Sequence, residues 1–329
     1  MPPPADIAAP GASVSLAGRR SWLGGRAGDR AWNGLVAVLA GAVLVIAGVI
    51  VLELVKLARP AMAAGATRFL LDQDWDPVAG TFGALTFIYG TVVTSVIAMT
   101  LAVPVSVGLA LFLSEMGPRR LRPPVAFAIE TLAAIPSVVY GLWGLFVMVP
   151  WLRQVVEPFL QGTLGFLPLF QGPAIGLGYL AAGLILSIMI LPTVTSVTGE
   201  VLKTVPPSLR EAALALGATR WEAIRMAVLP YSRPGIMGAA LLGLGRALGE
   251  TMAVTMVIGN SPEIHASLFA PGYTLPAVIA NEFAEATGAV QVGALAGLAL
   301  VLFGLSFLLN ALARILVRAV ARGPTRSPA

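Results

Sequence analysis

The sequence has 329 residues, of which 57% are hydrophobic and only 11% are charged, and its mean hydropathy is +0.87. Soluble domains carry about 25% charged residues, so this composition excludes a soluble globular protein and predicts an all-α membrane protein. The absence of cysteine excludes disulfides and thiolate chemistry, and the single histidine, His265, excludes a multi-histidine metal site within one chain.

The N-terminal segment, residues 1–31, is rich in Pro, Ala, Gly and Arg and is predicted to be a cytoplasmic tail without stable structure. The apolar run from Gly34 to Leu57 follows it. This run is longer than the roughly 7–15 apolar residues of a signal peptide. We therefore expect a retained first membrane span and not a cleaved signal.

Six apolar stretches are long enough to cross a bilayer, which takes roughly 20 helical residues each. A six-span domain is therefore expected over residues 32–320, with a cytoplasmic tail at 321–329. In the third span, Pro136 with Gly141 and Gly144 predicts a kink. The predicted spans are Trp32–Leu57, Gly83–Leu113, Pro124–Val149, Pro173–Val197, Gly235–Ile258 and Val290–Val317.

The basic residues give the six spans an orientation. Most of the 21 lysines and arginines lie before the first span, between the second and third, between the fourth and fifth, or after the sixth. Positively charged loops stay in the cytoplasm, so both termini are predicted to be cytoplasmic. The basic isoelectric point near 10.1 is thus a sign of membrane topology, and no nucleic-acid partner is expected.

The cytoplasmic loop at 201–234 contains two expected helix starts. Ser208 with Glu211 and Thr219 with Glu222 both match the capping-box pattern, in which a hydroxyl residue is followed three positions later by a glutamate. The pattern predicts two short helices in this loop.

Gly217 is predicted to end the first short helix, because a left-handed residue is favoured there. Pro230 and Pro234 are predicted to end the second. Each helix keeps an apolar side, so a hairpin that lies on the lipid headgroups is one interpretation.

A family resemblance gives a second interpretation. The motif Glu211-Ala212-Ala213, then Gly217, then Leu229-Pro230 resembles the EAA loop of permeases from ATP-binding cassette (ABC) importers, with Ala227 where the family has isoleucine. The resemblance implies the type I, MetI-like permease fold with cytoplasmic coupling helices. It also implies that these residues dock on a separate ATP-hydrolysing subunit.

Further motifs narrow the resemblance. Trp75-Asp76-Pro77, the segment 134–141 and the segment 245–251 resemble the PstC-type permease subunits of phosphate importers. That resemblance implies phosphate as the substrate and a location in the bacterial inner membrane, in contact with lipid. It also implies a heterodimer with a sister permease, two ATPase subunits and a periplasmic phosphate-binding protein.

The sequence contains no Gly-Lys pair, which a phosphate-binding Walker A loop requires. We therefore expect no ATPase site and no cofactor in this chain, with ATP and Mg²⁺ bound by the partner ATPase subunits.

Two opposite charges, Arg246 and Glu250, fall inside the fifth predicted span. A spacing of four places them on one helix face within ion-pair reach. They either neutralise each other structurally, or Arg246 is a counter-charge for a transported oxyanion, whose oxygens match a guanidinium. Thr251, and Ser137 beside the predicted kink, are the expected hydroxyl donors of the substrate path.

Three alternatives remain open from the sequence. In the first, the protein is an ABC permease whose cargo is another oxyanion, such as sulfate or molybdate, or an organic solute. In the second, the protein is a secondary transporter or channel that needs no ATPase. In the third, it is a sensory membrane protein that transports nothing.

Overall fold

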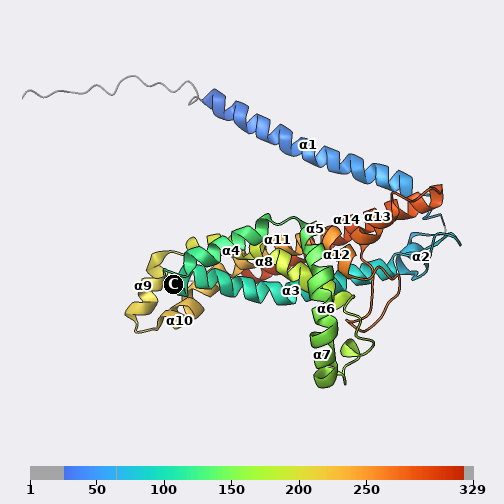
Figure 1. Ribbon diagram of the computed structural model, residues 1–329. Helices are drawn as coiled ribbons and strands as arrows, with labels where there is room; N and C mark the ends of the chain where they lie inside the picture. The colour runs from blue at the N-terminus through green and yellow to red at the C-terminus, as the bar shows by residue number, and fades with distance from the viewer. Residues whose placement is uncertain (1–25, 64, 322–329) are drawn as a thin grey trace, which may run out of the picture. The chain divides into compact units, whose positions relative to one another are not determined.

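The computed structural model describes residues 26–63 and 65–321, in two units divided between Glu53 and Leu54 (Figure 1). The first unit is most of helix α1 (Arg26–Ala58), which is apolar over almost its whole length. The tail predicted over residues 1–31 ends too late, because residues 26–31 already belong to α1. The rest of that tail and residues 322–329 lie outside the described residues.

The second unit is built around two long helices, α3 (Leu85–Leu111) and α8 (Tyr179–Lys203), which pack along each other. A π-helical turn, η1 (Phe112–Met116), extends α3. Close approach of the two helices depends on small residues: a Cβ at Gly183 of α8 would overlap Ile97 of α3. Helix α11 (Leu229–Gly249) packs on both, and α14 (Ala289–Ala321) packs on α11.

The third predicted span is broken in the structure. Helix α4 (Arg122–Ala134) ends before Ile135 and Pro136, which are extended, and a new helix begins at Ser137. Pro136 has no N–H to donate and disfavours helical geometry at Ile135, so the expected kink is confirmed as a complete break.

The new helix is continuous over residues 137–164. It consists of α5 (Ser137–Trp143), η2 (Gly144–Met148), α6 (Val149–Trp151), η3 (Leu152–Val156) and α7 (Glu157–Leu164). In Figure 1, α4 lies along α3 and α8, whereas α5 to α7 run across them. The kinked single span predicted over Pro124–Val149 is therefore two separate helices, and the second continues to Leu164.

The fifth predicted span is also divided. Short helix α10 (Arg220–Ala223) and π turn η5 (Ile224–Val228) lead without a break into α11, which ends at Gly249, and α12 (Met252–Val257) follows. Among the described residues, five helices are long and apolar enough to cross a membrane, and α11 is not one of them. Charged and proline residues in α11 reduce its mean hydropathy, although the helix lies against the bundle core.

The end of the unit opposite α9 (Pro207–Ala215) and α10 has short elements. They are α2 (Ala66–Leu71), the antiparallel pair β1 (Trp75–Asp76) and β2 (Thr81–Phe82), and α13 (Leu275–Glu282). The 3₁₀ turn η4 (Pro168–Phe170) packs against α7. Trp75 pairs with Phe82 across the strands and packs edge-on against both Phe82 and Phe87. These contacts attach the hairpin to the first turn of α3.

Candidate functional site

The segment predicted to be the coupling loop forms a hairpin of α9 and α10. Gly217 lies between them with φ +87°, in the left-handed region that favours glycine. Thr219 caps α10: its hydroxyl accepts from the Glu222 N–H at 3.4 Å, and Glu222 Oε2 accepts from the Thr219 N–H at 2.7 Å. Hydrogen bonds from the backbone and hydroxyl of Thr219 lower the pKa of Glu222. The predicted glycine corner and the second capping box are confirmed.

Two details of the predicted hairpin are wrong. Helix α9 begins at Pro207 with Pro206 as its N-cap and has no side-chain cap, so Ser208 and Glu211 lie inside the helix and do not form a capping box. Proline at the first helical position is favourable, and the helix starts two residues earlier than the predicted Ser208 cap would place it. The helix also continues through Pro230, because the preceding π turn widens it and gives the proline ring room.

The residues of the predicted coupling motif lie at or near the surface of the hairpin. Glu211, Ala212, Gly217 and Pro230 are exposed, and Ala213 and Leu229 are partly buried. Large apolar side chains are exposed around the motif, and they are Leu209, Leu214, Leu216, Trp221 and Met226, with Leu216 90% exposed. An exposed apolar surface next to a charged residue is typical of a site that binds another protein.

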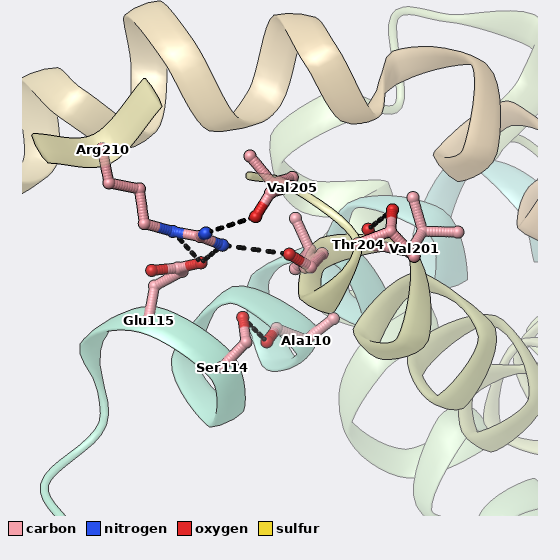
Figure 2. Close-up of polar contacts among 8 residues, drawn as sticks. Ala110, Ser114, Glu115, Val201, Thr204, Val205 and Arg210 are labelled. Atoms are coloured by element: carbon pink, nitrogen blue, oxygen red, sulfur yellow. Dashed lines mark hydrogen bonds and ion pairs between the residues drawn. The ribbon is translucent and has the colours of Figure 1, made fainter. Parts of the chain in front are cut away.

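Arg210 is a residue of the hairpin whose role the sequence did not reveal. Its guanidinium donates to Glu115 at the end of η1, to the Leu202 carbonyl in the last turn of α8 and to the Val205 carbonyl just beyond that helix (Figure 2). From the sequence alone, Arg210 is only one more positive charge in a cytoplasmic loop. Glu115 lies 95 positions earlier in the chain, so no local pattern connects the two.

The predicted Arg246–Glu250 pair does not form. Helix α11 ends at Gly249, and Glu250 is extended with φ −71° and ψ 126°. Spacing by four residues brings side chains together only on a continuous helix. Glu250 Oε1 instead accepts from the Ala253 N–H at 3.4 Å, at the start of α12. Arg246 is exposed and has no ion-pair partner in the described part of the chain.

The two helix breaks bring the remaining predicted path residues onto helices that pack together. Ser137 begins α5 after the first break, and Thr251 precedes α12 after the second, where its hydroxyl donates to the Gly249 carbonyl at 3.3 Å. Helices α5 and α12 are in close contact, because a Cβ at Gly141 would lie 2.5 Å from the sulfur of Met256.

Arg246 lies near the same junction. It lies in the last turn of α11, just before the second break, while the hydroxyl of Tyr140, in α5, lies at the first break. That hydroxyl donates to the Leu132 carbonyl at 2.7 Å and so bridges the first break from α5 back to α4. A guanidinium and hydroxyl groups at broken helices are chemically suited to an oxyanion. Within residues 26–63 and 65–321, no group of three acidic or histidine side chains is arranged to hold a metal ion.

Comparisons with known proteins agree with this architecture. A family model described as "Binding-protein-dependent transport system inner membrane component" matches residues 102–322. Among solved structures, a bacterial importer of the acidic polysaccharide alginate is similar, with a TM-score of 0.58 at 18% identity over 88% of this chain and 96% of that one. The MetNI methionine ABC transporter gives 0.53 at 18% identity, over 72% and 95%. At this identity the likeness shows the fold.

Other relatives share more sequence identity with this chain than these two solved structures do. The phosphate transport system permease protein PstC of Mesorhizobium japonicum is 50% identical over 85% of this chain and 87% of its own length. PstC of Haemophilus influenzae is 48% identical over 76% and 80%, and PstC 2 of Mycobacterium tuberculosis is 40% identical over 91% and 94%. The chain therefore belongs to the family of binding-protein-dependent transport system inner membrane components.

Proposed function

We propose that this protein is the membrane-spanning permease subunit of an ATP-driven phosphate importer. The observation that supports it most strongly is the 50% identity to a phosphate transport permease over 85% of the chain. The resemblance of the 75–77, 134–141 and 245–251 segments to PstC-type permeases points to the same substrate.

The energy source in this proposal is a separate ATPase subunit that binds the α9–α10 hairpin. The exposed motif residues, with Leu216 and Trp221 beside them, offer an apolar surface for such a subunit. The full complex would contain this chain, a sister permease, two ATPase subunits and a periplasmic phosphate-binding protein. ATP and Mg²⁺ would be bound by the ATPase subunits.

The membrane arrangement in this proposal has six crossings in the bacterial inner membrane. The α11–α12 segment supplies a crossing that its own hydropathy does not indicate. Both termini and the hairpin are cytoplasmic, as the distribution of lysine and arginine predicts.

The phosphate path in this proposal passes the junction of the two helix breaks. Arg246 supplies the counter-charge, and Ser137 and Thr251 supply hydroxyl donors. Glu250 does not neutralise Arg246, since its carboxylate accepts from the backbone of α12. Arg246 is thus left available to an anion.

The test is reconstitution of the four-component complex in liposomes, with uptake of radiolabelled phosphate measured with and without ATP. We expect uptake to require ATP and the binding protein, and to resist competition by sulfate and molybdate. Uptake that continues without ATP would instead indicate a secondary transporter or channel. Strong competition by another oxyanion would indicate a different cargo.

A further inference from the structure

We propose that the ion pair between Arg210 and Glu115 is the mechanical link that transmits movement of α9 to the membrane helices α3 and α8. The inference deepens the proposed function, because it rests on docking of the α9–α10 hairpin on an ATPase subunit. It makes Arg210 a positioning residue that acts through the helices it holds.

The contacts of Arg210 join three elements at one point (Figure 2). Its Nε and Nη2 both donate to Glu115 Oε1, at 3.1 and 2.6 Å. Nη1 donates to the Val205 carbonyl at 2.7 Å, and Nη2 also donates to the Leu202 carbonyl at 3.0 Å. One planar guanidinium thus binds the end of α3 and the end of α8 together.

Both attachment points favour a positive charge. The Leu202 carbonyl lies in the last turn of α8, at the negative end of the helix dipole, and the Val205 carbonyl lies two residues beyond that helix. Glu115 places a carboxylate at the corresponding end of α3, where that dipole is unfavourable for an anion. Arg210 contacts both, so its removal leaves the Glu115 carboxylate without its ion-pair partner and breaks the connection to α8.

Helix α9 has few other attachments. None of its side chains is buried, and Arg210 and Ala213 are its two partly buried residues. Among the residues of α9, all of them described, Arg210 alone makes side-chain hydrogen bonds to the rest of the unit. The buried apolar cluster beneath the hairpin is formed by α3, α8 and η5 with Val205, without α9. Besides its chain connections to α8 and α10 and its packing on η5, α9 is thus joined to the bundle by this one guanidinium.

The helices held by Arg210 are the ones on which the candidate path depends. Helix α11, which carries Arg246, packs on both α3 and α8. Movement of those two helices at the hairpin end therefore alters the surface that supports Arg246.

The chain offers a matched control pair. Lys203 and Glu200 also form an ion pair at the end of α8, at 2.7 Å, but their side chains are 68% and 71% exposed. The Arg210 and Glu115 side chains are 25% and 15% exposed. An exposed ion pair within one helix contributes little to stability and joins no separate elements. The Lys203–Glu200 pair therefore controls for the loss of charge without the loss of a connection between helices.

The experiment uses the complete complex in liposomes and measures radiolabelled phosphate uptake per ATP hydrolysed. The variants are Glu115→Gln and Arg210→Gln, with Glu200→Gln and Lys203→Gln as controls. Co-purification of the ATPase subunits is measured in each case. We expect the first two variants to retain the ATPase subunits and ATP hydrolysis, while uptake per ATP falls roughly tenfold, within the 5–150-fold range of coupling between sites. The controls should match the wild type.

An unchanged ratio in both Glu115→Gln and Arg210→Gln would overturn the proposal, as would an equal fall in the control pair. Arg210→Lys covers the case in which the glutamine variants do not assemble. It retains the charge but loses the planar fork, so a reduced ratio supports the link and a wild-type ratio contradicts it. Failure of all three variants to assemble would show a purely structural role. If wild-type complex takes up no phosphate, the proposed function fails instead.

Discussion

The indole N–H of Trp75 donates a 2.9 Å hydrogen bond to a carboxylate oxygen of Glu282, which lies 207 positions away in the chain. The contact joins the β1–β2 hairpin to the end of α13. Trp75 packs edge-on against Phe82 and Phe87 at the same time, so one side chain ties together three segments at this end of the bundle.

Replacing Trp75 by phenylalanine should remove the donor and keep most of the ring packing. We expect the free energy of unfolding to fall by about 1–3 kcal/mol, because Glu282 is left with an unsatisfied, partly buried acceptor. Thermal unfolding in detergent, followed by circular dichroism, measures the change. Trp151→Phe is the control, since Trp151 is 54% exposed and should tolerate the change. Equal losses in the two variants would contradict the role given to this hydrogen bond.

The stability of the fold should depend on pH through Glu282. Burial raises the pKa of Glu282, the hydrogen bond from Trp75 opposes the rise, and the nearby Glu285 carboxylate adds to it. The folded state therefore binds this proton more tightly than the unfolded state. The resulting stabilisation is fully present below the ordinary pKa of 4.5 and is lost as pH rises through the raised folded pKa.

Comparison with Glu282→Gln isolates this effect from other carboxylates. The melting temperature of the wild type, relative to that of the variant, should decline as pH rises from below 4.5 toward neutrality. A constant difference between the two proteins across this range would show that Glu282 has the same pKa in both states.

Gly217→Ala should weaken binding of the ATPase subunits. The φ of +87° at Gly217 is unfavourable for a residue with a Cβ, by roughly 1 kcal/mol or more, so the corner between α9 and α10 would shift. Gly199→Ala is the control, because Gly199 lies within α8 with open space around its Cβ position. Co-purification of ATPase subunits from detergent-solubilised membranes distinguishes the two. Undiminished binding in Gly217→Ala would show that the corner does not position the docking surface.

Arg246→Gln should reduce phosphate uptake without loss of the assembled complex. A hydrogen bond to a charged group contributes about 1.5–3 kcal/mol, so removing the guanidinium should lower uptake roughly tenfold to a hundredfold. Arg314→Gln is the matched control, since Arg314 is also exposed but lies on α14. Normal uptake by Arg246→Gln in reconstituted liposomes would remove Arg246 from the proposed path.

Some local signals in the sequence predicted the local structure correctly, although the expected Ser208–Glu211 capping box does not form. The Thr219–Glu222 capping box and the left-handed turn at Gly217 each depend on a few adjacent residues, and both are present. Pro136 interrupts its helix for the same kind of local reason. In contrast, the ion pair expected for Arg246 and Glu250 assumed an unbroken helix, and the break after Gly249 separates them.

The amino-acid sequence by itself determined that this is a helical membrane protein with a capped hairpin at one end, because composition, hydropathy and caps act over short stretches of chain. Only the tertiary structure decided which distant residues meet. Glu115 and Arg210 are joined by packing of α3, α8 and α9, and Trp75 and Glu282 by packing of β1 and α13. Such pairs depend on how whole helices cross, which no local pattern specifies.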